Sequence, residues 1–289
     1  NSSPMTPRQN QKGPLVSFEL KSAGYCTASW HHAQKGAPKK TIRFYATYAV
    51  IKHPKHGVIL FDTGYAKRFF SSTSSYPYKL YRAFTPVFVK PEEEAAAQLK
   101  ADGTPSEEVR YIIVSHFHAD HIGGLKDFPN ARFICDRAAY DDIKGKSGLS
   151  ALKKGFLPAQ MPEGFEERTD FLDIEKGLSK DGHLGNLHDL FDDGTILLTR
   201  LDGHAKGQLG ALLATEKGRV FLISDAAWLK PAYTDLKLPH PIVRLFFNSW
   251  AEYRASLNRV HNYHKAHPET LIIPCHCFET LKALNGLQS

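Results

Sequence analysis

The sequence predicts an α/β fold in which strands and helices lie in layers, and three features support this prediction. Short apolar runs rich in β-branched residues recur along the chain and alternate with stretches of helical periodicity. Several of these runs end in a polar or charged residue beside glycine, as strands do where they reach a turn. The length of 289 residues is ample for a packed core.

The first half contains predicted strands at residues 41–54, 57–64, 111–115 and 131–135. The first two are separated by a Lys-His-Gly turn, so we expect them to pair as an antiparallel hairpin.

Residues typical of the beginning and end of a helix lie between these strands. Residues 90–103 begin with proline and acids and end with glycine, which predicts a helix. Thr104 and Glu107 then match a capping box, which predicts a short second helix.

The second half is β-rich from about residue 194. Its predicted strands are residues 194–203, 208–215, 219–225 and 270–277. A helix is predicted at 248–264, because apolar residues there repeat at spacings of three and four.

The domain organisation follows from where these elements fall. Residues 1–13 have no periodic pattern and predict a flexible tail, and residues 14–289 predict a single domain. Residues 65–90 and 141–193 fit no regular pattern, so we expect excursions from the core, such as lids or substrate walls.

Composition limits the class of partner. The net charge is +7, but the basic residues are dispersed, so a solvated surface is expected and nucleic acid is not. No apolar run is long enough for a transmembrane segment. The four cysteines form no CxxC pair, which favours a reduced, cytoplasmic setting. Because the chain starts at Asn1, export of a processed precursor stays open, and the sequence leaves the oligomeric state undefined.

A dense group of ionisable residues follows the strand predicted at 111–115. The sequence SHFHADHIGG contains His116, His118, Asp120 and His121. Side chains two positions apart share a face of an extended strand, so the first two histidines should point the same way. A divalent cation binds neutral imidazole and carboxylate together and removes the repulsion between them. The group therefore predicts a metal site rather than a chance cluster of surface histidines.

Three polar residues elsewhere repeat this arrangement of a buried strand followed by a metal-binding side chain. His204 lies between two apolar runs, Asp225 ends VFLISD, and His276 follows TLIIPC. Each alone is typical of a structural hydrogen-bonding residue, but together they are expected to complete the metal site.

Taken in order, SHFHADHIGGL, GHAKG, LISDAAW and PCHC resemble the metallo-β-lactamase-fold hydrolases, and VILFDTG is similar to an early strand of that family. The resemblance spans roughly residues 40–280. It implies an αβ/βα four-layer sandwich, in which two facing mixed β-sheets are flanked by helices and carry the metal site at one edge.

Carried over position by position, the resemblance implies two metal sites that share one ligand. The implied ligands are His116, His118 and His204 for the first metal, Asp120, His121 and His276 for the second, and Asp225 as the bridge. Asp62 is similar to a residue that orients one of the ligand histidines. Members of the fold with true β-lactamase activity usually have cysteine in place of the bridging aspartate. The aspartate resembles the dinuclear members, which include lactonases, thioesterases, phosphodiesterases and nucleases.

Such a site implies hydrolysis by a metal-bridging hydroxide that attacks a polarised carbonyl or phosphoryl centre. Asp120 would then act as general acid and pass a proton to the leaving oxygen. Two divalent ions are expected, with zinc as the default and manganese, iron or cobalt also suited to these ligands.

The spacing resembles the N-acyl-homoserine lactonases, so the expected substrate is a small ester or lactone and the expected role is quorum quenching. Those lactonases typically carry a tyrosine three residues after the bridging aspartate, and here that position is Trp228. Tyr65 or Tyr233 would have to supply a hydroxyl instead. The candidate substrate pocket is Tyr65, Trp228, Tyr233, Phe246 and Phe247.

Other functions remain open at this stage. A glyoxalase II-like thioesterase and a phosphodiesterase or nuclease use the same kind of dinuclear site. A single-iron sulfur dioxygenase uses a subset of the ligands, and a non-catalytic binding module would need none of them. Cys275 and Cys277 flank His276 and are expected to point to the opposite face as packing residues.

Overall fold

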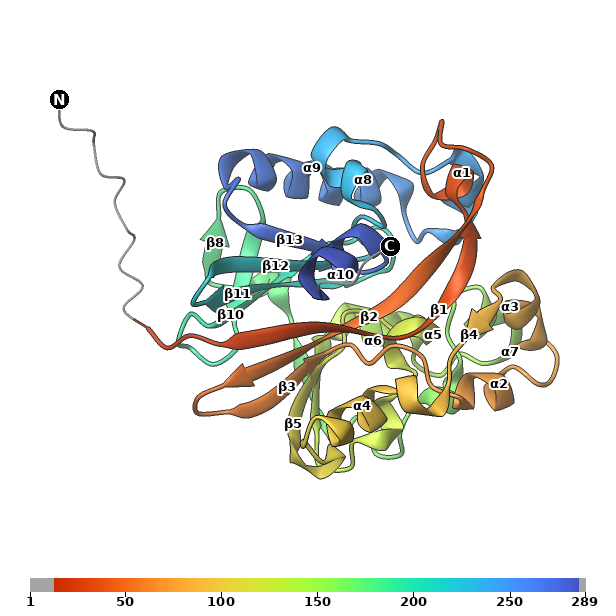
Figure 1. Cartoon of the computed structure of the whole chain (residues 1–289), viewed down its shortest axis with the longest axis horizontal. Coiled ribbons are helices and arrows are strands. Elements are labelled where there is room, and N and C mark those ends of the chain that lie inside the picture. Colours follow the sequence, from red (N-terminus) through yellow and green to blue (C-terminus); the bar gives the residue numbers. More distant parts are fainter. Residues whose placement is uncertain (1–12, 286–289) are drawn as a thin grey trace.

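The computed structural model describes residues 13–285, so the tail predicted at 1–13 lies outside the described residues except for Gly13. Two β-sheets of seven and six strands face each other, and helices cover their outer sides (Figure 1). The predicted four-layer sandwich with two mixed sheets is therefore confirmed.

The first sheet has seven strands in the order β4-β1-β2-β3-β5-β6-β7. These are β1 (Ser17–Ser29), β2 (Thr41–His53), β3 (Gly57–Phe61), β4 (Val87–Phe88), β5 (Val109–Ile113), β6 (Arg132–Asp136) and β7 (Thr169–Leu172). β2 and β3 pair antiparallel, which confirms the predicted hairpin. β3, β5, β6 and β7 run parallel to one another.

The second sheet has six strands in the order β13-β12-β11-β10-β9-β8. These are β8 (Ser179–Asp181), β9 (Gly185–Asp189), β10 (Ile196–Arg200), β11 (Leu209–Thr215), β12 (Gly218–Ser224) and β13 (Leu271–Pro274). β12 and β13 are parallel, and the other pairs are antiparallel.

The helices connect these strands or pack on the outer faces of the sheets. They are α1 (Trp30–Ala33), α2 (Arg68–Ser72), α3 (Lys79–Phe84), α4 (Ala95–Ala101), α5 (Ala119–Ile122), α6 (Arg137–Ile143), α7 (Gly148–Leu152), α8 (Lys230–Asp235), α9 (Trp250–Ala266) and α10 (Phe278–Asn285). Short 3-10 helices η1 (Pro91–Glu93), η2 (Ser106–Glu108), η3 (Leu125–Asp127), η4 (Pro158–Gln160), η5 (Ile174–Lys176) and η6 (Pro241–Phe246) complete the set.

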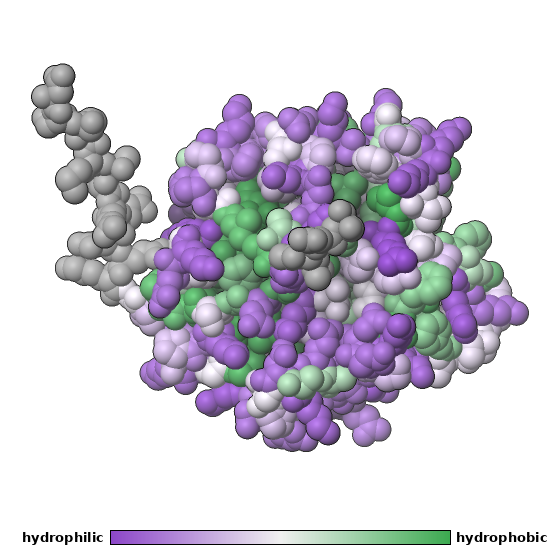
Figure 2. All heavy atoms as spheres, viewed as in Figure 1, coloured by the Kyte–Doolittle hydropathy of each residue, from purple (hydrophilic) through white to green (hydrophobic). Residues whose placement is uncertain are grey.

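Apolar side chains fill the spaces between the layers. Between the sheets, Ile59 and Ile113 of the first sheet pack in one cluster with Leu198 and Leu222 of the second. Separate clusters lie between the first sheet and α4 and α6, and between the second sheet and α8 and α9. Hydrophilic residues cover most of the face shown in Figure 2, as expected when the apolar side chains are used between layers.

Four local features differ from the sequence-based expectations. The helix expected at 90–103 is split into η1 and the shorter α4. The capping box of Thr104 and Glu107 does not form, because Pro105 precedes a single 3-10 turn and no side chain caps it. The long strand β1 was not predicted. The segment 141–193 also supplies β7, β8 and β9 to the edges of the two sheets.

The substitution Gly203→Ala tests how tightly the loop before His204 packs against α9. The φ of Gly203 is +128°, and a Cβ atom there would lie 2.0 Å from the backbone nitrogen of Tyr253. We expect Gly203→Ala to lower the free energy of unfolding by more than about 3 kcal/mol, because backbone atoms must move. Denaturant unfolding followed by circular dichroism measures the change.

Gly36→Ala is the matched control, because Gly36 also has a positive φ, +86°, but no atom lies within 4 Å of its added Cβ. It should cost only the backbone strain of about 1 kcal/mol. Equal losses for the two variants would contradict tight packing at Gly203.

Candidate metal centre

The predicted ligands meet at one edge of the two sheets because parallel strands end there together. β3 and β5 are parallel in one sheet, and β12 and β13 are parallel in the other. His116 lies in the loop after β5, Asp225 follows β12, and His276 follows β13. The loop between β10 and β11 carries His204. Segments far apart in the chain are thus brought to a single site.

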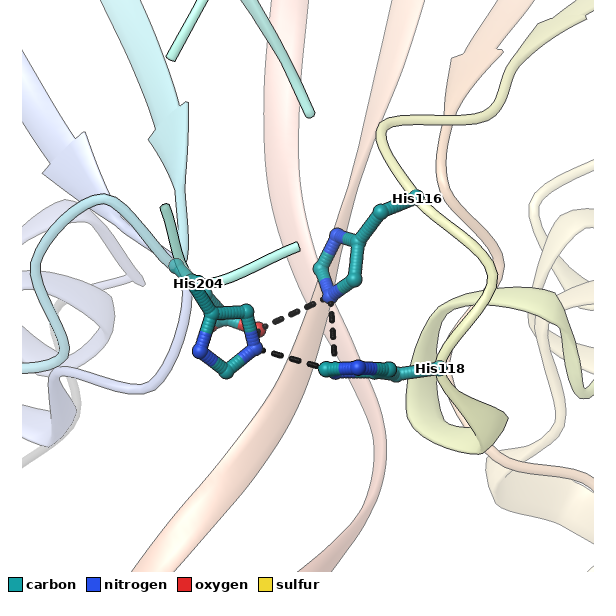
Figure 3. Close-up of side chains that lie close together, drawn as sticks. His116, His118 and His204 are labelled. Carbon is teal, nitrogen blue, oxygen red and sulfur yellow. Dashed lines mark hydrogen bonds and ion pairs between the residues drawn. The ribbon is translucent and has the colours of Figure 1, made fainter. Parts of the chain in front are cut away.

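The first cluster consists of His116, His118, His204 and Asp225, whose ligand atoms all lie within 4.8 Å of one another. His118 Nδ1 lies 3.1 Å from His116 Nε2 and 2.9 Å from His204 Nε2. Asp225 Oδ2 lies 3.2 Å from His116 Nε2 and 3.1 Å from His204 Nε2. Figure 3 shows the imidazole rings pointing toward one another from two separate loops.

A cation suits this cluster better than hydrogen bonds do. His118 Nδ1 can hold at most one proton, so it can donate to only one of the two imidazole nitrogens beside it. The other imidazole nitrogen would then lie close to His118 Nδ1 in a buried place without a hydrogen bond of its own. A divalent transition metal accepts the lone pairs of all the imidazoles at once.

The second cluster lies on the other side of Asp225. His121 Nε2 is 2.9 Å from Asp225 Oδ2, and His276 Nε2 is 2.8 Å from Asp225 Oδ1. Asp120 Oδ2 lies 3.3 Å from His121 Nε2 and 3.2 Å from His276 Nε2. Asp225 Oδ1 is buried and has no hydrogen-bond donor despite the close histidine. The two His/Asp clusters share Asp225 and are consistent with a dinuclear metal site.

Cys275 lies in the second cluster, contrary to the expectation that it points to the opposite face. Its Sγ is within 4.8 Å of the ligand atoms of His121, Asp225 and His276. Thr47 Oγ1 lies 3.4 Å from this sulfur atom. β13 ends at Pro274, so the strand alternation assumed for this segment no longer applies at Cys275. The sequence carried no signal for this position of the thiol.

Asp62 connects the ligand-bearing loops beneath the clusters. Its Oδ1 accepts from the backbone N–H of Ser115 at 2.8 Å, and its Oδ2 accepts from Ser115 Oγ at 2.7 Å. The same Oδ2 lies 2.7 Å from His121 Nδ1. Holding a proton on Nδ1 makes Nε2 the nitrogen of His121 that could bind a metal ion beside Asp225. Tyr45 plays the same part for His276, whose Nδ1 lies 2.8 Å from its carbonyl oxygen.

Two residues beside the ligands have backbone conformations that are costly for L side chains. Asp62 has φ +61°, and Ser224, which precedes Asp225, has φ +51°. Such strain is retained where the surrounding structure requires a particular direction of a side chain. Here it directs Asp62 under the clusters and turns Asp225 out of β12 toward both of them.

Burial keeps two of the histidines neutral. It lowers the pKa of His116 to about 4, and the neighbouring His121 adds to the effect. It also holds the pKa of His118 well below its ordinary value, with His116 and His204 contributing. Neutral imidazole is the form that binds a metal ion.

The carboxylates of the clusters are ionised and require positive charge nearby. Burial opposes ionisation of Asp120, but His121 and His276 hold its pKa well below the ordinary value. Burial likewise opposes ionisation of Asp225, and the same histidines lower its pKa. Burial also opposes charging of these two histidines, yet the carboxylates raise their pKa values well above normal. Divalent cations would supply the positive charge that this region demands.

An aromatic wall lies beside both clusters. Phe44 stacks on His276 with ring centres 5.2 Å apart, and Phe247 meets the edge of His204 at 5.2 Å. Trp228 lies between them, 5.7 Å from Phe44 and 5.3 Å from Phe247. The sequence singled out Trp228 and Phe247, but nothing in the sequence pointed to Phe44.

The remaining candidate pocket residues separate into different places. Tyr65 is buried in the apolar cluster that contains Phe44 and Ala119. Phe246 is exposed at the rim of a cavity beside the first cluster. Tyr233 is not at the site, because it is buried in the core under α9 and its hydroxyl donates to the carbonyl of Ile272 at 3.4 Å. Tyr233 follows Trp228 closely in sequence, but it lies in α8 and its side chain packs in the cluster between the second sheet and α9, away from the metal ligands.

Within residues 13–285, no helix combines the length and apolar character needed to cross a membrane.

Comparisons with known proteins extend over most of the chain. The sequence profile of the metallo-β-lactamase superfamily matches residues 42–265. The N-acyl homoserine lactonase AttM of Azorhizobium caulinodans is 29% identical over 196 residues, covering 66% of this chain and 68% of that protein. AttM of Agrobacterium fabrum is 26% identical over 229 residues, covering 78% and 79%.

Solved structures show the same fold. An N-acyl homoserine lactone hydrolase with the product N-hexanoyl-L-homoserine bound at its catalytic metal center matches with a TM-score of 0.71 at 20% identity, covering 94% of this chain and 96% of that one. The dizinc quorum-quenching lactonase AidC matches with a TM-score of 0.62 at 14% identity, covering 92% and 89%. Two His/Asp clusters that have Asp225 in common lie at the edge of the sandwich, and the superfamily profile matches most of the chain. The chain therefore belongs to the metallo-β-lactamase superfamily, as a metallohydrolase related to the N-acyl homoserine lactonases.

Proposed function

We propose that this protein is a dinuclear metallohydrolase that opens the ester ring of a lactone, with N-acyl-homoserine lactones as the reference substrates. The observation that carries the proposal is the convergence of two His/Asp clusters on Asp225. The similarity to curated lactonases over 66% and 78% of the chain supports the choice of a lactone.

The residues that would hold the metals follow from the clusters. The first metal would be held by His116, His118 and His204, the second by Asp120, His121 and His276, and both by Asp225. When bound, such ions supply hydroxide near neutral pH and polarise the carbonyl group of a substrate. Zinc is the first candidate, and the set of nitrogen and oxygen ligands also suits manganese, iron or cobalt.

The protein's own groups would orient the ligands and manage one proton. In lactone hydrolysis, water adds its hydroxyl group to the carbonyl carbon, the ring C–O bond breaks, and the leaving oxygen takes up a proton. We assign this proton transfer to Asp120, because 12% of its side chain is exposed, against 2% for Asp225. Phe44, Trp228 and Phe247 would limit the entry of bulk water on one side.

Tyr65 is the better of the two tyrosines for a supporting hydroxyl. Burial, with the nearby Cys26 and Asp120 adding, holds the pKa of Tyr65 well above its ordinary value. Its hydroxyl keeps its proton, and it would have to leave its partner, the Cys26 thiol, to donate to an oxygen of a substrate. Tyr233 already donates within the core.

Metal content tests the dinuclear site. Protein purified without added metal should contain about two equivalents of transition metal per chain, measured by elemental analysis. His118→Ala should keep about one equivalent, because it alters only the first cluster, and Asp225→Ala should lose most of both. Both variants should have lost lactone hydrolysis while their circular dichroism stays near wild type.

His188→Ala is the control, since this histidine lies on β9 away from the clusters. One tightly held iron in the wild-type protein would contradict the dinuclear site and favour a sulfur dioxygenase.

Asp62→Asn tests the orientation of His121. The amide keeps the shape but replaces an acceptor oxygen by an NH₂ donor, so it opposes the protonated Nδ1 of His121. Metal affinity of the second cluster should fall about 10- to 100-fold, as measured by competition with a chelator. Asp170→Asn, at an exposed pair with Arg132, should leave the affinity unchanged. An unaltered affinity in Asp62→Asn would show that the hydrogen bond does not position the ligand.

A substrate panel tests the reaction. We expect ring opening of N-hexanoyl-homoserine lactone with kcat/KM at least about 100-fold above that for S-lactoylglutathione, a bis-aryl phosphodiester or a penicillin. Release of acid followed in a pH-stat measures the lactones. Hydrolysis of the thioester or the phosphodiester alone would replace the lactonase proposal by the corresponding alternative.

A further inference from the structure

A cavity of about 160 Å³ opens directly onto the first cluster. His116, His118 and His204 form its inner wall. Its outer wall includes Lys153, Lys154, Lys206, Leu245 and Phe246. Ligand pockets usually have volumes of about 300–1,000 Å³, so this cavity has room for one part of a substrate whose reacting bond lies at the clusters.

The outer wall carries uncompensated positive charge. Lys154 is neutralised by Asp142, with Nζ 2.9 Å from the carboxylate. Lys153 and Lys206 are exposed, and neither has an ion-pair partner in the part of the chain that the structure describes. Asp142 is the one acidic residue that lines the cavity among the described residues. The cavity therefore has an excess of two positive charges close to the metal clusters.

Glycine contacts hold the backbone near both free lysines in place. Gly155 follows the lysine pair, has φ +62°, and would bring a Cβ to 3.0 Å from the ring of His118. Its carbonyl accepts from the backbone N–H of Ala119 at 3.2 Å. Lys206 is followed by Gly207, where a Cβ would lie 2.5 Å from the nitrogen of Ala139. The long side chains are exposed, and these backbone contacts hold the positions from which they extend next to the metal ligands.

We propose that this cavity, with Lys153 and Lys206, binds a carboxylate on the non-reacting part of the substrate, so that the preferred substrates are anionic lactones or esters. The inference rests on the proposed function for the reacting bond, but the binding of the carboxylate stands on the cavity alone. A neutral substrate would leave both lysines without a partner beside the clusters.

The apolar part of the wall limits what joins the carboxylate to the reacting ring. Leu245 is 88% exposed and Phe246 is 74% exposed, and both line the same cavity as the lysines. A short hydrocarbon linker would cover part of this apolar surface while its end reaches the lysines. The substrate class is therefore a lactone or ester with a short apolar spacer and a terminal carboxylate.

The first experiment uses the metal-loaded protein and a matched pair of lactones, a γ-butyrolactone that carries a propanoate chain on its γ carbon and the carboxamide of the same chain. We expect kcat/KM to favour the carboxylate about tenfold at low ionic strength, since two exposed lysines each contribute a few-fold. The difference should be in KM rather than kcat, because the charge is bound alike in the ground state and the transition state. It should shrink at high salt.

The double variant Lys153→Gln/Lys206→Gln should remove the preference and leave turnover of the carboxamide unchanged. Lys180→Gln is the control, because this lysine is exposed on β8, outside the cavity. A preference that survives in the double variant, or equal rates for the two lactones in the wild type, would overturn the carboxylate site.

A binding measurement separates this inference from the proposed function. Calorimetry would compare dicarboxylates from succinate to adipate with their monoamides on the metal-loaded protein. At least one dicarboxylate should bind about tenfold more tightly than its monoamide, and only in proteins that keep both lysines. If that holds while neither lactone opens, the carboxylate site stands and the lactonase proposal fails. If the lactones open but no dicarboxylate is preferred, the lactonase proposal stands and the carboxylate site fails.

Discussion

The site depends on charge compensation among buried groups. Asp62, Asp120 and Asp225 are all buried, and an ionised carboxylate in such a place is stable only with opposite charge or several hydrogen-bond donors. Asp62 meets this requirement with donors from Ser115 and His121. Asp120 and Asp225 instead face imidazole nitrogens, which compensate a negative charge only when they carry a proton or share a cation. The loops around this edge are therefore arranged so that imidazole groups lie next to the two carboxylates.

The two sheets meet this demand through the direction of their strands. Parallel pairs in each sheet bring Asp62 and His116, and Asp225 and His276, to the same edge from independent parts of the chain. The apolar layer between the sheets fixes the distance across the site, because Ile59, Ile113 and Leu222 pack directly behind these strand ends. The positive φ values at Asp62 and Ser224 are local costs that this packing can sustain.

Sequence reasoning found those parts of the site that depend on local pattern. A histidine or aspartate at the end of an apolar strand is visible in one segment of sequence, and all seven proposed ligands have this form or lie in the His-x-His-x-Asp-His string. β1 was not predicted for two reasons. A register shift between Ser22 and Tyr25 interrupts its alternation of apolar and polar residues, and most of its residues are small or polar. Cys275, Phe44 and the burial of Tyr233 depend on contacts between distant segments, and no local pattern records them.

The same distinction explains why the metal site does not decide the substrate. The metal ligands come from strand ends that the whole fold positions, and proteins of very different sequence can share such a fold, as the TM-score of 0.71 at 20% identity illustrates. The cavity beside His118 and His204 is instead lined by the residues just after α7 and by the end of η6 with the two residues that follow it. These connections are free to vary in charge and shape without disturbing the sheets. Because Lys153 extends from such a connection, its charge can change without altering the sheets, which is why we propose that this cavity sets the substrate preference.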